Sequence, residues 1–297
     1  MAGKNRKIVV ILGLTATGKS DLAVKLAKRF GGEVISADSR QVYKGLDIAT
    51  GKITKKEMRG VPHHLLSVAS PKRNFSAADY KKLAEKKIEE ILARRKLPII
   101  CGGTGFYISA LLGEIELANV PPNKSLRKRL LGSPASKLFS MLKKLDPKRA
   151  KTIDAKNPVR LIRAIEIAKA GPAQAKPARA LNSLSYKIVK IGLNLPEKEL
   201  KERIHLRTLK RLKQGMIAEA KRLHKQGLSY RKMGELGMEY RLLAEYLNNK
   251  ITKEQLIEGI EKENWHYAKR QMRWFKRDKE IRWVKSTNVL FFRNFTD

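Results

Sequence analysis

The stretch of sequence that most constrains the fold is residues 8–20, where an apolar run leads directly into a glycine-rich loop. Residues 8–12 read IVVIL, which is typical of a buried strand, and residues 13–20 read GLTATGKS, which matches the pattern G-x-x-x-x-G-K-S. From Leu22 to Phe30 apolar residues recur at helical spacing. A strand, this loop and a helix in succession predict a P-loop, because the loop N–H groups and the helix N-terminus then face the same anion.

The P-loop predicts a phosphate-binding site. Lys19 adds a full positive charge, and the Ser20 hydroxyl is suited to ligating Mg²⁺. The residues expected to bind the phosphates of a diphosphate or nucleotide are Gly13, Leu14, Thr15, Ala16, Thr17, Gly18, Lys19 and Ser20. The loop alone does not say which molecule carries the phosphate.

A second strand is expected at residues 33–36, and Asp38 follows its carboxyl end. Open α/β sheets bind ligands outside the carboxyl ends of their strands. We therefore expect Asp38 to share a crevice with Lys19.

A third strand is expected at residues 98–101, followed by Gly102, Gly103 and Thr104. A P-loop NTPase places an aspartate at this point to hold Mg²⁺. In this chain no aspartate stands at that point, which argues against routine ATP hydrolysis. The two glycines predict a close approach of the backbone to a ligand, and Thr104 offers a hydroxyl donor.

The charge of the chain points to a polyanionic partner. Its 297 residues include 65 Lys and Arg against 28 Asp and Glu, for a formal net charge of +37, and the excess is greater after residue 120. Neutralising phosphates with such cations releases counterions and favours binding of nucleic acid. The alternative is a basic surface that is merely solvated.

Other composition features exclude several classes of protein. Cys101 is the only cysteine, so no disulfide forms within one chain, which fits a reducing cytosol. No apolar run approaches the ~20 residues of a membrane-spanning helix. The adjacent His63 and His64 invite a metal interpretation, but no cysteine lies near them and a structural role is favoured. We expect a cytoplasmic protein.

The chain divides into three predicted regions. Residues 1–120 form the P-loop core, 121–180 a basic helical insertion, and 181–297 a return strand with basic helices that complete the core. The expected elements of the later regions are helices at 125–131, 136–145, 157–170, 197–226 and 252–277, a Pro/Ala-rich linker at 171–179, a strand at 186–195 and a loop at 234–241.

Two arginine pairs and one mixed segment are candidate contacts for phosphate. Arg160 and Arg163 share a helix face, as do Arg203 and Arg207, which could point together into the crevice. Residues 265–277 interleave aromatic and basic side chains, a pattern that suits nucleic acid. The alternative is that these aromatic side chains belong to the core and the cations are solvated.

Several segments occur in a characteristic order: GLTATGKS, ISADSRQVYKGLDIATGK, GVPHHLL, FSAADY, PIICGGTGFYISALL, NPVRLIRAIEIAK, LGMEYR and YAKRQMRWF. This succession, which spans nearly the whole chain, resembles the bacterial tRNA dimethylallyltransferases. The resemblance implies an α/β fold: a P-loop kinase-like parallel sheet flanked by helices, with an inserted helical domain and a helical C-terminal third. It also implies transfer of a dimethylallyl group from dimethylallyl diphosphate to the exocyclic amino group of the adenosine 3′ of the tRNA anticodon.

The chemistry of such a transfer assigns roles to the residues above. Breaking the allylic C–O bond places charge on diphosphate, which the P-loop and Mg²⁺ would stabilise. The adenine amino group loses a proton as it attacks, and Asp38 is the best-placed carboxylate to accept it. With the resemblance, the catalytic residues are Asp38, Lys19, Thr15, Thr104 and one of Arg203 and Arg207. The implied tRNA contacts are Asp38, Ser39, Arg40, Gln41, Thr104, Arg127, Val159, Arg160, Leu161, Ile162, Arg163, Leu236, Gly237, Met238, Glu239, Tyr240 and Arg241.

Two positions depart from the family pattern, Ser67 and Leu209, each where an aspartate is usual. The expected partners are the anticodon stem-loop of tRNA and dimethylallyl diphosphate, and we expect a monomer. Three alternatives stay open: a small-molecule P-loop kinase, an RNA-binding GTPase or ATPase-like module with no need of Asp38, and a transferase acting on free AMP. The last should not need an inserted basic domain.

Overall fold

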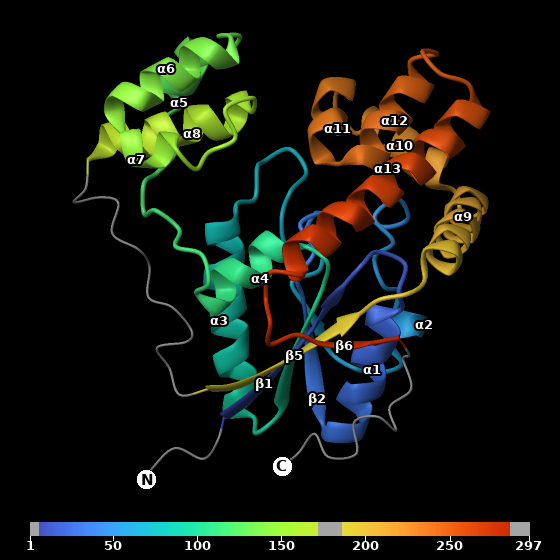
Figure 1. Ribbon diagram of the computed structural model, residues 1–297. Helices are drawn as coiled ribbons and strands as arrows, with labels where there is room; N and C mark the ends of the chain where they lie inside the picture. The colour runs from blue at the N-terminus through green and yellow to red at the C-terminus, as the bar shows by residue number, and fades with distance from the viewer. Residues whose placement is uncertain (1–5, 172–185, 286–297) are drawn as a thin grey trace. The chain divides into compact units, whose positions relative to one another are not determined.

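The computed structural model describes residues 6–171 and 186–285. Its centre is a six-stranded sheet of order β3-β2-β4-β1-β5-β6, in which every neighbouring pair is parallel (Figure 1). Parallel neighbours need crossover connections, and helices supply most of them. The strands are β1 (Arg6–Gly13), β2 (Gly32–Ser36), β3 (His63–His64), β4 (Leu97–Cys101), β5 (Tyr186–Leu193) and β6 (Arg282–Val284).

Helices cover both faces of the sheet, because β1 sends alternate apolar side chains to each side. Val9 and Ile11 pack with helix α1 (Lys19–Phe30). Ile8 and Val10 belong to the larger core, which contains α3 (Ala77–Ala93) and α4 (Gly105–Leu112). A four-residue helix, α2 (Lys55–Met58), precedes β3.

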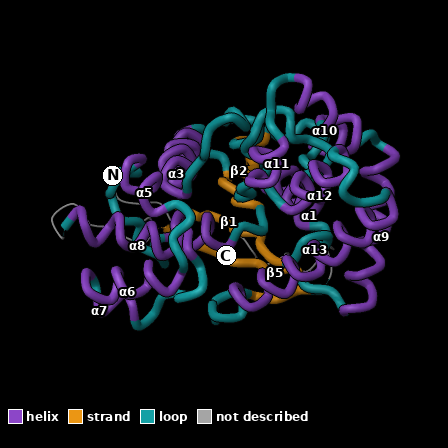
Figure 2. Tube along the Cα trace, turned by 90° about the horizontal axis from the view of Figure 1, so that it is seen from above, coloured by secondary structure: helices purple, strands orange, loops and turns teal. Residues whose placement is uncertain are grey.

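The remaining helices of this unit gather beyond the carboxyl edge of the sheet. In Figure 1 they lie above the upper ends of the strands, and Figure 2 shows them together on one side when viewed from above. They are α9 (Glu197–Lys213), α10 (Met216–Lys225), α11 (Tyr230–Leu236), α12 (Met238–Leu247) and α13 (Lys253–Phe275). The predicted fold class, a parallel sheet flanked by helices with a helical C-terminal third, is confirmed.

Two predicted elements of this region are wrong. The single helix expected at 197–226 is two helices, because Gly215 adopts a left-handed φ of 98° that ends one helix and begins the next. The loop expected at 234–241 is mostly helical: α11 ends and α12 begins at Gly237, whose φ is 146°. The short strand β6 has no counterpart in the sequence prediction.

Residues 113–180, described to 171, form a second compact unit of their own. Its core is apolar and includes Leu138, Leu142, Leu161 and Ile165. Its helices are α5 (Lys124–Leu130), α6 (Ala135–Leu145), α7 (Pro147–Ala150) and α8 (Pro158–Ala170). Beyond Gly171, the predicted linker lies outside the described residues. Within the described ranges, no helix is both long and apolar enough to cross a bilayer.

Candidate active site at the carboxyl edge of the sheet

A cavity of about 740 Å³ lies at the carboxyl edge of the sheet. Its wall includes the P-loop, residues after β2, part of the 50–59 segment, the loop after β4, the arginines of α9, and residues of α12 and α13. Lys19 and Asp38 both line it, as the sequence predicts. The lining residues used below are Thr15, Lys19, Ser20, Asp38, Ser39, Arg40, Gln41, Gly51, Arg203, Arg207, Arg211, Glu239, Asn264, Tyr267 and Gln271.

The P-loop closes on its own backbone before α1 begins. The hydroxyl of Thr17 donates to the Leu14 carbonyl over 2.8 Å, and the Lys19 ammonium donates to the same oxygen. Gly18 forms the N-cap of α1 with a φ of 88°, a conformation that glycine adopts at no steric cost. Ser20 lies in the first turn of α1, on the cavity. The loop therefore presents a helix N-terminus, one ammonium and one hydroxyl to the same space.

Lys19 and Arg207 are cations that form no ion pair with another described residue. Neither is within 4.0 Å of a carboxylate in the part of the chain that the structure describes; their hydrogen bonds go to neutral oxygens. The pKa of Lys19 is lowered to about 8, mainly by burial; repulsion from Arg207 acts in the same direction, whereas Cys101 and Asp38 act against it. Burial, with repulsion from Arg211, lowers the pKa of Arg207 to about 9. Uncompensated cations of this kind favour an anionic ligand.

The structure distinguishes the two α9 arginines that the sequence left as alternatives. The Arg207 guanidinium donates to the Thr15 hydroxyl over 2.9 Å and to Asn264 Oδ1 over 2.8 Å. Arg203 also lines the cavity, but its half-exposed side chain pairs with Glu199 at 2.8 Å. Arg207 is therefore the arginine held against the P-loop.

The Asp38 carboxylate is oriented by backbone N–H groups of the residues that follow it. Oδ1 accepts the N–H groups of Arg40 over 2.8 Å and Gln41 over 3.3 Å, an Asx turn. Oδ2 has no hydrogen-bond partner in the described residues, so one oxygen of the carboxylate stays available. Beside it, the Thr104 hydroxyl oxygen accepts the Ser39 N–H over 3.0 Å. Ser39 lines the cavity and Thr104 is not among the lining residues described.

The glycines after β4 lie against other parts of the protein and also line the cavity. A Cβ on Gly102 would lie 2.1 Å from the Ala37 carbonyl oxygen, and one on Gly103 would lie 2.2 Å from Gln271 Nε2. The structure therefore places this loop against the end of β2 and α13, and the close approach to a ligand stays a prediction.

Helix α13 supplies residues that the sequence analysis missed. Gln271 accepts the Thr15 N–H over 2.7 Å and donates to the Gly103 carbonyl over 2.9 Å, so its amide joins the two loops. One turn earlier, the Tyr267 hydroxyl donates to the same carbonyl over 3.1 Å. Their four-residue spacing places both on one face, but the sequence alone does not say which face meets the P-loop.

The aromatic residues of the mixed segment of α13 pack against the protein. Phe275 is buried in the core. Trp265 is partly buried against a smaller hydrophobic cluster, and the ammonium groups of Lys201 and Lys269 lie 4.9 Å and 5.4 Å from its ring centroid. Binding of nucleic acid by this segment stays a prediction.

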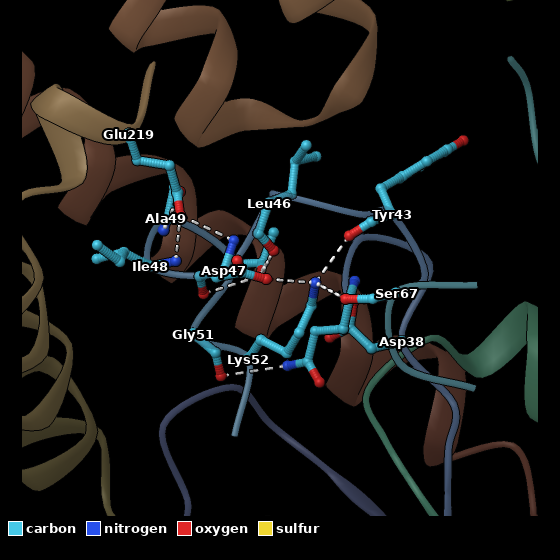
Figure 3. Close-up of polar contacts among 12 residues, drawn as sticks. Asp38, Tyr43, Leu46, Asp47, Ile48, Ala49, Gly51, Lys52, Ser67 and Glu219 are labelled. Atoms are coloured by element: carbon cyan, nitrogen blue, oxygen red, sulfur yellow. Dashed lines mark hydrogen bonds and ion pairs between the residues drawn. The ribbon is translucent and has the colours of Figure 1, made fainter. Parts of the chain in front are cut away.

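The loop after Asp38 is held by two buried charges (Figure 3). Glu219 accepts the N–H groups of residues 47–49 over 2.9, 2.8 and 3.0 Å. Lys52 donates to the Tyr43 carbonyl, to Asp47 and to Ser67 over 2.7, 2.6 and 2.8 Å. Ser67, which departs from the family pattern, is thus still a Lys52 partner, and Asp47 provides the negative charge.

The residues implied to contact tRNA fall into three groups. Ser39, Arg40, Gln41 and the 237–239 segment line the cavity. The side chains of Leu161, Leu236 and Tyr240 are buried in hydrophobic cores, so tRNA could reach only their backbone. Arg241 pairs with Glu245 and Glu263. The contacts themselves stay predictions.

In the second unit, two of the predicted tRNA-binding arginines hold one buried carboxylate. Arg127 binds Glu166 through two hydrogen bonds of 3.0 and 2.7 Å, and Arg163 forms a further ion pair with it. Val159 and Arg160 are exposed on the outer side of the same helix, and Ile162 is half-buried. Only Val159 and Arg160 of this segment are freely presented to solvent.

Of the paired histidines, His64 has a contact that fits the structural role favoured from the sequence. His64 Nε2 lies 2.7 Å from the Glu33 carboxylate, which also binds Arg94 over 2.8 Å. The described residues contain no cluster of three or more His, Cys, Asp or Glu side chains suited to a metal.

A parallel sheet whose first strand leads through a glycine-rich loop into a helix, with ligand-facing residues at the carboxyl edge, defines an α/β protein of P-loop architecture. Comparison with known proteins makes the assignment more specific. The family model described as IPP transferase matches residues 41–278. The chain belongs to the IPP transferase family.

Individual relatives cover nearly all of the chain. The tRNA dimethylallyltransferase 2 of Treponema denticola is 44% identical over 266 residues, which is 89% of this chain and 89% of that protein. The crystal structure of the full-length tRNA isopentenylpyrophosphate transferase from Bacillus halodurans has a TM-score of 0.68 at 37% identity, covering 95% of this chain and 90% of that one. The corresponding structure from Staphylococcus epidermidis has a TM-score of 0.70 at 33% identity, with coverages of 99% and 98%.

Proposed function

We propose that this chain transfers a dimethylallyl group from dimethylallyl diphosphate to the exocyclic amino group of the adenosine 3′ of the anticodon in tRNA, releasing diphosphate. One observation supports this most directly: Lys19 and Arg207, both without a carboxylate partner in the described chain, line the same cavity as Asp38. An anion site and an available carboxylate in one cavity are what this transfer needs. Membership in the IPP transferase family supports the same reaction.

The cations around the P-loop would stabilise the leaving group. As the C1–O bond of the donor breaks, its electron pair goes to diphosphate, and negative charge grows there. Lys19 and Arg207 both line this region, so two positive charges lie close to where the negative charge would grow. Thr15 would contribute by holding Arg207 in place.

Mg²⁺ is the proposed cofactor, and Ser20 is the residue that would hold it. Proteins commonly bind Mg²⁺ through one or two of their own oxygens together with substrate phosphates and water. The Ser20 hydroxyl, at the start of α1 and on the cavity, fits such a site. When bound, the ion would add positive charge beside the diphosphate.

Asp38 is the proposed general base. The amino nitrogen of adenine forms the new bond to C1 and its proton becomes acidic as it does so. Oδ1 of Asp38 is engaged by two backbone N–H groups, whereas Oδ2 is free to accept that proton. The backbone contacts fix the direction of the carboxylate, and the proton leaves the nitrogen as the N–C bond forms.

The basic residues of the chain would bind the tRNA, which must present its target adenosine outside the base stack. Cations such as Arg160 are exposed in the second unit, and Arg40 and Gln41 line the cavity. We propose that the protein acts on tRNA in the cytoplasm, as a monomer.

Mass spectrometry of anticodon stem-loop RNA after incubation with the protein, dimethylallyl diphosphate and Mg²⁺ tests the proposal. One dimethylallyl group on the adenosine 3′ of the anticodon is the expected product, and it should be absent with Lys19→Met. Parallel reactions supply free AMP as acceptor and ATP with candidate small-molecule acceptors. Equal prenylation of AMP, or transfer of the ATP γ-phosphate, would assign the chain to one of the alternative activities.

A further inference from the structure

Arg211 is a residue of the cavity wall that neither the sequence patterns nor the proposed reaction explains. It lies on α9, four residues beyond Arg207, so the two side chains share a helix face. Arg211 is 9% exposed and lines the cavity. A long charged side chain is rarely buried to this extent unless it is paired.

The contacts of Arg211 leave much of its guanidinium unused. Nη1 donates to the Ala49 carbonyl over 3.1 Å and lies 4.0 Å from the Glu239 carboxylate, too far for a hydrogen bond. In residues 6–171 and 186–285 the donors on Nε and Nη2 have no hydrogen-bond partner. Nη2 lies against Gly51, where a Cβ would be 1.8 Å away. Neither nitrogen is among the fully buried unpaired polar atoms of the described residues, so both donors keep access to the cavity, where an oxygen ligand from outside the chain can accept from them.

Holding the loop at residues 47–49 in place does not explain why an arginine stands at position 211 in the cavity wall. Glu219 already binds three consecutive N–H groups of that loop (Figure 3). The Tyr240 hydroxyl donates to the same carboxylate over 2.7 Å. The single bond from Arg211 to Ala49 adds little to this attachment.

The charges around Arg211 point to an anion. Arg207 and Lys19, on the same cavity, have no carboxylate partner in the described chain. The carboxylate nearest to Arg211 is Glu239, which also accepts a hydrogen bond of 3.3 Å from Asn264. Three cations therefore face a space in which protein carboxylates balance only part of their charge.

We propose that Arg211 is a second guanidinium of the anion site, which contacts a phosphate oxygen of a bound substrate. This inference rests on the proposed function, because it takes the substrates to be a prenyl diphosphate and an RNA. Both carry phosphate, and the planar fork of donors on arginine matches phosphate oxygens. The experiment distinguishes a contact with the diphosphate of the prenyl donor from a contact with a phosphate of the RNA.

The first arm measures the affinity of inorganic diphosphate by calorimetry for the wild type, Arg211→Met and Arg211→Lys. If Arg211 contacts the donor, Arg211→Met should bind diphosphate at least about tenfold more weakly, since a hydrogen bond to a charged group is lost. Arg211→Lys should recover part of the affinity, which a loss of packing alone would not allow.

The second arm measures tRNA affinity against salt concentration. If Arg211 contacts an RNA phosphate, Arg211→Met should flatten the slope of log K against log[salt] by about 0.7 to 0.9, and diphosphate affinity should stay at the wild-type value. The matched control is Lys213→Met, which removes the same charge from an exposed position of α9 outside the cavity lining described here. It should leave diphosphate affinity unchanged.

Wild-type values in both arms for a folded Arg211→Met would overturn the proposal and leave Arg211 as a wall residue. If Arg211→Met does not fold, Arg211→Gln replaces it, since its amide can still donate to the Ala49 carbonyl. Diphosphate binding is measured without turnover, so the proposed reaction and the proposed role of Arg211 can be disproved independently. A wild type that does not prenylate tRNA overturns the proposed function, whereas unchanged binding in the variant overturns the role of Arg211.

Discussion

The Arg207 guanidinium donates a 2.9 Å hydrogen bond to the Thr15 hydroxyl, across a sequence separation of 192 residues. The same nitrogen donates to Asn264 on α13 over 2.8 Å. The C-terminal helices therefore complete the proposed phosphate site that the first twenty residues begin. A P-loop alone would have only Lys19 as a full charge; α9 brings a second one to it.

The first prediction concerns the two α9 arginines. Arg207→Met should lower kcat/KM by about 10²–10³, because a preorganised donor to the developing diphosphate charge is lost. Arg203→Met is the matched comparison one turn away and should cost much less, since Arg203 is half-exposed and paired with Glu199. Steady-state kinetics with both substrates decides between them. Equal losses in the two variants would mean that the contact with Thr15 does not mark the catalytic arginine.

The second prediction follows from the lowered pKa of Lys19, about 8 in the free protein because of burial. A bound diphosphate stabilises the ammonium and raises this pKa, so binding takes up a proton when the pH exceeds about 8. Below that pH Lys19 is already charged. Above it, affinity should fall with rising pH, by up to about tenfold per unit.

Calorimetry of inorganic diphosphate between pH 7 and 9, in buffers of different ionisation enthalpy, measures both the affinity and the proton uptake. Lys19→Met should bind more weakly at pH 7 and lack the part of the uptake that Lys19 contributes. The same uptake in the wild type and in this variant would assign it to the ligand or to Arg207, whose pKa is also lowered, to about 9.

The third prediction concerns Asp38. Asp38→Asn keeps an oxygen that can accept the Arg40 and Gln41 N–H groups, so the turn should persist. The amide cannot take a proton, and the chemical step should slow by about 10²–10⁴ while tRNA binding stays close to wild type. Single-turnover measurements with saturating enzyme isolate that step. A wild-type rate would remove Asp38 from the role of base.

The sequence predicts the P-loop side of the site well and the other side poorly. Residues 13–20 and Asp38 are recognisable because strand, loop and helix are contiguous, and local patterns determine where each side chain lies. Gln271, Asn264 and Arg211 lie on amphipathic helices whose faces are set by packing against distant parts of the chain. Nothing in their local spacing identifies the face that meets Thr15.

The errors in the predicted secondary structure have a similar cause. The apolar periodicity continues through 197–226 and therefore predicts one helix. It carries no information about the left-handed conformation that Gly215 adopts. The glycines near 234–241 suggest a loop, yet only Gly237 interrupts the helices, because Met233, Leu236 and Tyr240 are buried on either side of it. In both places tertiary packing decides whether a glycine ends a helix.

The fourth prediction concerns the stability of the second unit. Burial alone would raise the pKa of Glu166, but hydrogen bonds from Arg127 and Arg163 lower it to about 2. A depressed carboxylate pKa stabilises the folded state fully above the unfolded value of 4.5 and loses this contribution as the pH falls toward 2. The unit should therefore unfold more readily at pH 3 than at pH 7.

Thermal unfolding at several pH values, followed by hydrogen exchange of residues 124–170, measures the effect. Glu166→Gln should be less stable than the wild type at pH 7 and should show a weaker dependence on pH between 2 and 5. An unchanged pH dependence in this variant would place the acid sensitivity elsewhere.

The fifth prediction separates two arginines that the sequence places on one helix face. Arg160 is exposed, and its closest carboxylate in the described chain is Asp154 at 4.0 Å, an exposed pair of little energetic value. Arg163 instead binds Glu166 and donates to the Val120 carbonyl over 2.7 Å.

Arg160→Ala should therefore weaken tRNA binding and flatten the slope of log K against log[salt] by about 0.7 to 0.9, the loss of one phosphate contact, with stability unchanged. Arg163→Ala should act mainly through folding, with a lower melting temperature, because it leaves a buried carboxylate short of a partner. Titration of labelled tRNA at several salt concentrations, paired with melting curves, measures both. A flattened slope in Arg163→Ala without loss of stability would mean that this arginine exchanges Glu166 for an RNA phosphate on binding.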